Sequence, residues 1–401
     1  MIDYILNKQA RLIKSVPNAF VRKEYIDKLT SKNRLVGLVG SRGVGKTTLL
    51  LQYLKQNYEI TDFLYFSADD IYLSDSSLYG IVEEFIKLNG KVVVIDEIHK
   101  YNNWAAELKT IYDSFPNILI RFSGSSMLNI LEQKSDLSRR AVIANVNILS
   151  FREFLALKEN IVLPPLKLQE ILSDSAKISS HYALTYPNLY KLFKKYLEFG
   201  AYPFFLEDEE EFKNKLFNAL EKIIREDIPS LNSINYEHIV LFKKIIAKLI
   251  FSKVPYKLNA TKLAKELNIS YTTLLFYLDI LDRANVINSV KKFSKNISKK
   301  PEKLLFSNTN ILNAFASDFK IDVEIGTIRE TFFVSCFKNS GFDIFYSDIG
   351  DFIANNTIYE IGGKNKSFKQ VKDIKNSYLA IDVDYTLEKN KIPLWMFGFL
   401  Y

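Results

Sequence analysis

Over the first 150 residues, short apolar runs alternate with longer segments in which apolar residues recur at helical spacing. Short apolar runs are typical of buried parallel strands, which carry hydrophobic side chains on both faces. The expected strands are residues 35–38, 63–67, 92–95, 118–123 and 141–149, and the expected helices are residues 20–29, 48–56, 78–88, 104–115 and 127–134. Strands that alternate with helices predict an α/β fold with a doubly wound, mostly parallel sheet.

The pattern changes after residue 150. From 151 to 236 the apolar spacing is helical throughout. Two short helical segments, 261–267 and 271–281, then flank a turn and lead into a strand at 286–290, which is the spacing of a helix-turn-helix with a wing. The last part returns to an α/β pattern, with an expected helix at 328–336, strands at 343–347, 352–354, 358–361 and 378–383, and a buried terminal strand at 392–401.

These changes divide the chain into four expected parts. They are an α/β core at 1–155, a helical linker or lid region at 156–240, a winged-helix domain at 241–320 and a small α/β domain at 321–401. A chain of 401 residues is long enough to bury several cores, so a division of this kind agrees with its length.

Composition and charge are those of a large soluble protein. The chain is 48% hydrophobic and 25% charged, and its formal net charge of +8 permits a nucleic-acid partner without requiring one. Cys336 is the only cysteine, which excludes an intramolecular disulfide and a cysteine-based zinc site and fits a reducing compartment. The N-terminus lacks a signal-peptide pattern, and no apolar run approaches the roughly 18 residues of a membrane span. We therefore expect a cytoplasmic protein with no membrane partner.

Residues 40–47, G-S-R-G-V-G-K-T, fit the phosphate-binding pattern G-x-x-x-x-G-K-[ST] between an expected strand and an expected helix. Glycines let backbone N–H groups curl around phosphate oxygens, and the helix N-terminus favours their negative charge. Lys46 would reach the β- and γ-phosphates, and the Thr47 hydroxyl would hold Mg²⁺. The alternative is a Gly-rich turn with no ligand. The expected ATP-binding residues are Gly40, Ser41, Arg42, Gly43, Val44, Gly45, Lys46, Thr47 and Thr48.

A second motif, K-V-V-V-I-D-E-I-H-K at residues 91–100, places two carboxylates at the end of an apolar strand. Ligands of open α/β sheets bind at the carboxyl ends of strands. Asp96 can therefore bind, through water, the Mg²⁺ that Thr47 also holds, and Glu97 is placed to activate the attacking water. The alternative is a solvated turn, but the order of the two motifs favours a nucleotide site with His99 as its neighbour.

Two further features are candidates for catalysis. Ser125, in the S-G-S-S stretch after the expected strand at 118–123, either senses the γ-phosphate or caps the next helix. Arg139 and Arg140 precede the strand at 141–149 and either reach the nucleotide of a neighbouring subunit in a homo-oligomer or are solvated.

The expected winged helix has an uneven distribution of charge. Residues 270–282, the second helix and its cap, contain no Lys or Arg, so this helix is a poor reader of DNA bases. The wing is rich in lysine, at Lys291, Lys292, Lys295, Lys299 and Lys300. This pattern predicts DNA phosphate contacts without base readout, and the alternative is a winged helix that only packs against protein.

These stretches together resemble a known family. The chain is similar, over essentially its whole length, to prokaryotic AAA-type P-loop ATPases that carry a C-terminal domain of unknown function. The matching stretches are G-S-R-G-V-G-K-T, V-V-V-I-D-E-I, F-S-G-S-S, L-S-F-R-E-F-L at 149–155, G-A-Y-P at 200–203 and Y-E-I-G-G-K at 359–364. The resemblance implies an oligomeric ATPase whose C-terminal part combines a winged helix with a fold similar to PD-(D/E)xK nucleases.

The nuclease comparison departs from its pattern at one position. Such a site needs an Asp on one strand and Glu-x-Lys on the next, which Asp351 and Glu360 fit, but Gly362 stands where the lysine is expected. Lys364 would share a face with Glu360 only if the strand continued through the glycine pair, which favours a bulge instead. We expect a degenerate nuclease-like site of Glu330, Asp351, Glu360 and Lys364 without nuclease activity.

The sequence thus predicts a Mg²⁺-dependent ATPase that couples its nucleotide state to a C-terminal winged-helix and nuclease-like module. One alternative is a nucleotide-gated DNA-binding or regulatory module with little turnover. A second is an ATP-regulated, metal-dependent nuclease. A protein partner is also expected, but the sequence does not identify it.

Overall fold

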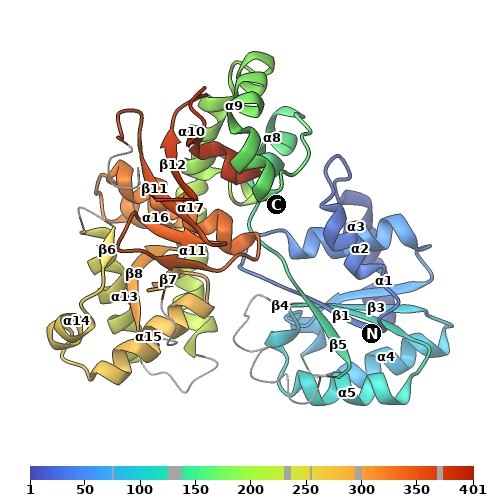
Figure 1. The fold of residues 1–401 in the computed structure, drawn as a ribbon. Coiled ribbons are helices and arrows are strands. Elements are labelled where there is room, and N and C mark those ends of the chain that lie inside the picture. Colours follow the sequence, from blue (N-terminus) through green and yellow to red (C-terminus); the bar gives the residue numbers. More distant parts are fainter. Residues whose placement is uncertain are drawn as a thin grey trace. The chain divides into compact units, whose positions relative to one another are not determined.

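The fold was analysed in a computed structural model that describes residues 1–74, 76–124, 137, 139–229, 236–252, 255–293, 300–367 and 374–401. Contacts between Cα atoms divide the chain into two compact units, Met1–Asn147 and Ile148–Tyr401 (Figure 1). The four-part division expected from sequence stays a prediction, and each unit is described by itself below.

The first unit contains a five-stranded sheet in which all neighbours are parallel. Its strands are β1 (Leu35–Val39), β2 (Phe63–Ser67), β3 (Val92–Asp96), β4 (Leu119–Gly124) and β5 (Ala141–Asn145), in the order β2-β3-β4-β1-β5. The predicted parallel α/β core is therefore confirmed. Because β4 lies between β1 and β3, the residues that follow β1 and β3 face each other across the carboxyl end of β4.

Helices cover both faces of this sheet (Figure 1). They are α1 (Ile2–Ser15), α2 (Lys23–Leu29), α3 (Lys46–Asn57), α4 (Leu78–Lys87) and α5 (Trp104–Ser114), with the short 3-10 turns η1 (Ile71–Leu73) and η2 (Ile98–Lys100). The sequence reasoning did not predict α1. Its buried Gln9 accepts a bond from the Tyr65 N–H at 2.8 Å and donates to the Phe63 carbonyl at 3.1 Å. This side-chain amide therefore covers the open edge of β2, which has no strand neighbour on that side.

The second unit begins with the helical segment that the sequence predicted. Its elements are α8 (Phe151–Glu159), α9 (Leu168–Thr185), α10 (Leu189–Phe199), the 3-10 turn η3 (Pro203–Leu206), α11 (Phe212–Lys222), the π-helical turn η4 (Ile223–Asp227) and α13 (Tyr236–Ile250). Ser150 begins this segment with a reciprocal cap, in which its hydroxyl accepts from the Glu153 N–H and the Glu153 carboxylate accepts from the Ser150 N–H.

Two sheets follow in the same unit. A three-stranded antiparallel sheet has β8 (Pro301–Phe306) between β6 (Tyr256–Lys257) and β7 (Ile287–Lys291), next to α14 (Ala260–Glu266) and α15 (Tyr271–Arg283). After α16 (Thr309–Asp318) and α17 (Ile325–Asn339), a mixed sheet runs in the order β13-β12-β11-β10-β9. Its strands are β9 (Ile344–Tyr346), β10 (Phe352–Ala354), β11 (Thr357–Gly363), β12 (Ser377–Asp382) and β13 (Lys391–Pro393). The names winged helix and nuclease-like fold for these two parts stay predictions.

Two local predictions are wrong. The glycine pair forms no bulge, because Gly362 and Gly363 pair in regular parallel register with Ile381 and Asp382 of β12, and the strand ends only after them. The segment 392–401 is not a strand throughout, since β13 ends at Pro393 and the 3-10 turn η6 (Leu394–Phe399) follows. Proline has no N–H to donate to a ladder, which explains the early end of that strand. The burial predicted for this segment holds, as every residue of η6 is buried.

Among the described helices, none combines the length and apolarity needed to cross a membrane.

Candidate nucleotide site

The predicted phosphate loop joins β1 to α3, and its backbone requires glycine at three positions. Gly43 and Gly45 adopt left-handed conformations with φ of 82° and 93°. A Cβ atom on Gly40 would lie 2.3 Å from the Val146 carbonyl oxygen, so no larger residue fits there. The loop therefore keeps the tight path that brings successive N–H groups to the N-terminus of α3.

Lys46 is the first residue of α3 and is buried. Its ammonium donates to the carbonyl oxygens of Gly40 at 2.9 Å and Ser41 at 3.0 Å. The positive charge is thus held inside the loop by its own backbone.

Asp96, the last residue of β3, is the centre of a hydrogen-bond network. Its Oδ2 accepts from the Thr47 hydroxyl at 2.6 Å and from the Tyr65 hydroxyl at 2.8 Å. Its Oδ1 accepts from the Ser123 hydroxyl and from the Glu97 N–H, the latter at 3.1 Å. The structure therefore brings together Thr47 and Asp96, the two residues predicted to hold the metal ion.

The sequence reasoning missed Tyr65, and within the S-G-S-S stretch at 123–126 it preferred Ser125 to Ser123 as the hydroxyl at the site. Ser123 also accepts a bond from the Glu97 N–H at 3.1 Å, so it links β4 to both carboxylate residues. The register of β3 with β4 brings it there, because Ile95 pairs with Phe122 and the next residues are Asp96 and Ser123. Ser125, the serine predicted for this role, lies outside the described residues.

Glu97 follows Asp96 in a left-handed backbone conformation, with φ of 49°. Burial raises the pKa of its carboxyl group; the charge of Lys46 opposes this rise, that of Asp96 adds to it, and that of Arg42 opposes it. The buried His99 ring lies with Nε2 3.5 Å from Glu97 Oε2. Glu97 is therefore electrostatically coupled to the phosphate loop, and His99 is a neighbour of this site as predicted.

The two candidate arginines differ in their surroundings. Arg140 pairs with Asp113 of its own chain through two bonds, from Nε at 3.0 Å and from Nη2 at 2.9 Å. Arg139 is exposed. Their predicted role across a subunit interface stays a prediction.

Three residues of the predicted nuclease-like site lie together in the second unit, but the fourth does not. Glu330 of α17, Asp351 before β10 and Glu360 of β11 interact electrostatically, whereas Lys364 lies in an exposed turn after β11. Two other lysines, both missed by the sequence reasoning, contact these carboxylates. Lys303 of β8 contacts Glu330 at 2.5 Å and Asp351 at 4.0 Å, and Lys366 contacts Glu360 at 2.5 Å.

Burial raises the pKa of Glu330 to about 7, opposed by Lys303 and assisted by Asp351 and Glu360. Burial also raises the pKa of Glu360, against the hydrogen bond from Lys366.

The predicted basic wing is partly neutralised. Lys292 pairs with Asp348 at 2.5 Å, and Lys300 lies 4.0 Å from Glu302. Lys295 and Lys299 lie outside the described residues, and Lys291 is exposed at the end of β7.

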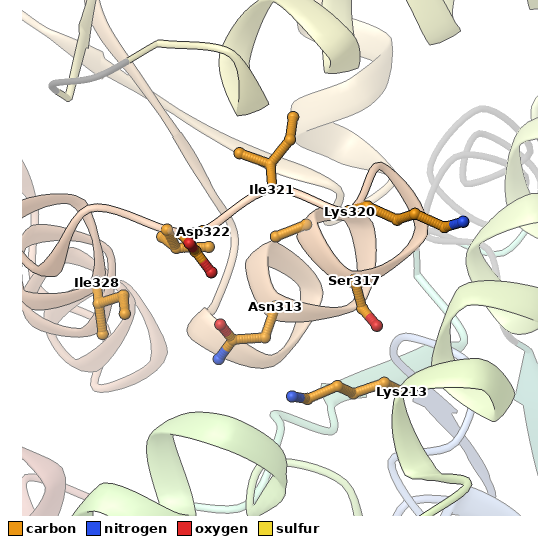
Figure 2. A pocket seen from close by; sticks show the side chains of 9 residues that line it. Lys213, Asn313, Ser317, Lys320, Ile321, Asp322 and Ile328 are labelled. Carbon is orange, nitrogen blue, oxygen red and sulfur yellow. The ribbon is translucent and has the colours of Figure 1, made fainter.

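A cavity of about 410 Å³ opens between α11, α16 and the segment that joins α16 to α17 (Figure 2). Its polar lining residues are Lys213, Asn313, Ser317, Lys320 and Asp322, and none of these side chains is fully buried. The lining mixes ammonium groups with a carboxylate, so its charge favours no class of ligand.

Comparison with known proteins identifies two regions of the chain. Residues 32–155 match a family described as an AAA domain, and residues 190–321 match a domain of unknown function, DUF8612. The uncharacterized protein MJ1637 of Methanocaldococcus jannaschii is 31% identical over 410 residues, covering 92% of this chain and 86% of MJ1637. A second protein of that organism, MJ1544, is 26% identical over 65% of this chain and 57% of its own length.

Solved structures match the chain more weakly. C. elegans PCH-2 aligns with a TM-score of 0.24 and 21% identity over 39% of this chain, and the S. cerevisiae Hsp104-ADP complex with a TM-score of 0.34 and 20% identity over 70% of it. This chain covers 43% and 42% of those two chains, which is less than half of each.

The phosphate loop and the carboxylates at the end of β3 lie in the region that matches the AAA domain, and the match to MJ1637 extends over nearly the whole of both proteins. The chain therefore belongs to the family of MJ1637 and carries an AAA-type P-loop domain at its N-terminal end.

Proposed function

We propose that the protein binds and hydrolyses ATP with Mg²⁺ at the loop between β1 and α3. The observation that supports this most is the hydrogen bond of 2.6 Å between Thr47 and Asp96, beside the buried ammonium of Lys46. A hydroxyl and a carboxylate at that place are the oxygen ligands that Mg²⁺ takes next to a phosphate chain.

In this proposal Lys46 exchanges its two carbonyl partners for the β- and γ-phosphate oxygens of ATP. The loop N–H groups bind the remaining phosphate oxygens at the N-terminus of α3. Thr47 and Asp96 would hold Mg²⁺, which neutralises charge on the phosphates when bound. The hydrogen bonds that hold Lys46 in the loop and Thr47 against Asp96 support these roles.

Glu97 orients the attacking water and accepts its proton at the side-chain carboxylate. The raised pKa of this group makes it a better proton acceptor than an exposed glutamate. The Glu97 N–H is held by Asp96 and Ser123, which fixes the backbone from which the side chain extends. His99, 3.5 Å from the Glu97 carboxylate, limits the directions in which that carboxylate can turn.

Turnover of ATP by the purified chain tests the proposal. Lys46→Ala should abolish binding or hydrolysis, because it removes the charge that meets the phosphates. Glu97→Gln should keep ATP binding and lower turnover by roughly 10²–10⁴-fold, the usual contribution of a positioned base. Undiminished turnover in Lys46→Ala would remove the site from consideration. If Glu97→Gln changes nothing because the parent chain already has negligible turnover, the chain is a nucleotide-gated binder instead.

Coupling of the nucleotide state to the Ile148–Tyr401 unit is a further part of the proposal. A ligand shifts a conformational equilibrium only as far as it binds two states unequally, so ATP and ADP must differ in their effect. Hydrogen exchange of residues 148–401 with ATP, with ADP and without nucleotide would measure this coupling. Identical hydrogen exchange in the three states would show that the nucleotide bound to the first unit does not affect residues 148–401.

A further inference from the structure

The carboxylate cluster of the second unit, Glu330, Asp351 and Glu360, invites comparison with a metal centre. Buried carboxylates that converge at strand ends are the usual ligands of Mg²⁺ and Mn²⁺ in nucleases of the fold that this part resembles. The chain places the three residues on α17, before β10 and on β11, so the fold brings together acidic side chains from different elements. Whether they fit a cation depends on what already contacts them.

Each carboxylate of the cluster already has a cationic or backbone partner. The ammonium of Lys303, whose side chain is 4% exposed, contacts Glu330 at 2.5 Å and lies 4.0 Å from Asp351. The other Asp351 oxygen, Oδ2, accepts the Ile361 N–H at 2.8 Å. Among the described residues, no group of three or more His, Cys, Asp or Glu side chains is arranged to hold a metal ion. The cluster as folded therefore does not fit a divalent cation.

The second ammonium reaches the cluster because residue 362 is glycine. A Cβ atom on Gly362 would lie 2.5 Å from Cγ and 2.6 Å from Cβ of Lys366. The Lys366 side chain thus occupies the space above β11 that a side chain at position 362 would fill, and its ammonium contacts Glu360 at 2.5 Å. Gly362 and Glu360 are two residues apart on one strand, so they share a face. The lysine that the nuclease pattern places at 362 is supplied here from 366.

We infer that Lys303 and Lys366 are resident counter-cations that take the place of a metal ion, and that the cluster binds no divalent cation in the folded chain. Two ammonium groups against three carboxylates leave at most one negative charge to attract a cation. A divalent cation between Glu330 and Asp351 would have to displace Lys303, whose side chain is buried, and leave that charge without a partner, which is strongly unfavourable. This inference is independent of the proposed ATPase activity.

Mn²⁺ binding to the full chain without nucleotide, measured by the loss of the free-ion electron paramagnetic resonance signal, tests the inference. The parent chain should show no Mn²⁺ site that Asp351→Asn or Glu360→Gln removes. Lys303→Met should create such a site, binding Mn²⁺ more than about tenfold tighter than the parent chain, because three carboxylates then face one ammonium. Glu360→Gln added to Lys303→Met should remove it again. Lys364→Met, which neutralises the exposed lysine of the same turn, is the matched control and should bind as the parent chain does.

Mn²⁺ binding by the parent chain and by the lysine variants decides whether the inference holds. Tight Mn²⁺ binding by the parent chain that disappears in Asp351→Asn and Glu360→Gln would overturn the inference and support a metal centre. Lys366→Met is a second route to the same result if Lys303→Met fails to fold, since it leaves Glu360 without its ammonium. If both lysine variants fold and still bind no Mn²⁺, the lysines are not what excludes the cation, and the inference is wrong. Any Mn²⁺ held at Thr47 and Asp96 is unaffected by these substitutions, so failure here does not bear on the ATPase.

Discussion

At the scale of single residues, the Asp96 carboxylate shows how the candidate site is held. Four donors contact it, two on each oxygen, and they come from α3, β2, β4 and the following peptide. Such a carboxylate cannot rotate without breaking hydrogen bonds, so its orientation is set before a ligand binds. The local motifs predict Thr47 and Asp96. The S-G-S-S stretch predicts a serine hydroxyl near Asp96 but not that it is Ser123, and no local motif predicts Tyr65, whose contact depends on β2 lying next to β3.

Tyr65→Phe tests the importance of this fixed orientation. The substitution removes one hydrogen bond to Asp96 Oδ2 and leaves the buried ring in place. A net loss of about 1 kcal/mol in Mg²⁺ binding is expected, which corresponds to a roughly fivefold higher Mg²⁺ concentration at half-maximal ATP turnover. Turnover at saturating Mg²⁺ should change less. Tyr58→Phe, which alters a tyrosine pair away from the site, is the control. An unchanged Mg²⁺ dependence in Tyr65→Phe would show that Tyr65 does not position Asp96.

Glu330 makes stability depend on pH in a predictable direction. Its folded-state pKa of about 7 lies above the ordinary value of 4.5, so the folded protein binds the proton more tightly than the unfolded chain does. The resulting stabilisation is complete below pH 4.5 and is lost as the pH rises through about 7. The loss amounts to about 3 kcal/mol for this group.

Glu330→Gln cannot ionise and should not show this loss. The free energy of unfolding of both proteins can be measured in urea between pH 4.5 and about pH 7. As the pH rises over this range, the variant should become more stable relative to the parent chain. Glu324→Gln, at an exposed position just before the same helix, should follow the parent chain. A constant difference between Glu330→Gln and the parent chain across this pH range would refute the raised pKa.

At the scale of elements, β11 explains where sequence reasoning succeeds and where it fails. The segment 358–361 is correctly predicted to be a strand, and it pairs with β10 on one side and β12 on the other. The sequence predicts a bulge at the glycine pair, because glycine alone stabilises a strand poorly. Pairing with β12 outweighs that local preference, and the cost is offset because Lys366 and Arg329 lie against the two bare positions. No pattern in the sequence indicates that the side chains of Lys366 and Arg329 lie against these two glycines.

Gly362→Ala tests this reading of β11. The new methyl group would overlap the Lys366 side chain, and we expect it to displace that side chain from Glu360. Overpacking of this kind destabilises by roughly 1–3 kcal/mol. Gly326→Ala is the matched control, because no atom lies within 4 Å of its added Cβ and it is part of α17. It should be neutral or slightly stabilising, since alanine favours helix. Equal unfolding midpoints for Gly362→Ala and the parent chain would contradict the contact.

At the scale of the whole molecule, element order in the sequence predicts fold class but not topology. Strands alternating with helices indicate a parallel sheet, yet the order β2-β3-β4-β1-β5 is not readable from that alternation. The order matters because it places β4 between the two strands that carry the phosphate loop and Asp96. In the second unit, the bridge from Lys292 to Tyr346 and the contact of Phe293 with Phe345 join β7 to β9. Such long-range pairings explain why segments with different sequence patterns form one compact unit.

The predicted role of Arg139 and Arg140 requires that the protein assembles into a homo-oligomer. If an arginine completes the nucleotide site of a neighbouring subunit, ATP turnover per subunit should rise with protein concentration. Arg139 is the better candidate, because Arg140 is already engaged with Asp113 of its own chain. Arg139→Ala should then lower turnover by about 10³–10⁵-fold, the range for an arginine supplied across an interface. Arg140→Ala should lower it less, and it is the matched control.

Mixing distinguishes an arginine that acts across the interface from one that acts within its own subunit. Arg139→Ala subunits retain Glu97, and Glu97→Gln subunits retain Arg139, so a mixed assembly contains interfaces at which an intact Glu97 meets an intact arginine. Some turnover should therefore return on mixing two proteins that are each inactive. Full turnover by a subunit that stays monomeric on dilution would rule out the interface arginine while leaving the ATPase itself in place, because Lys46, Thr47, Asp96 and Glu97 all belong to one chain.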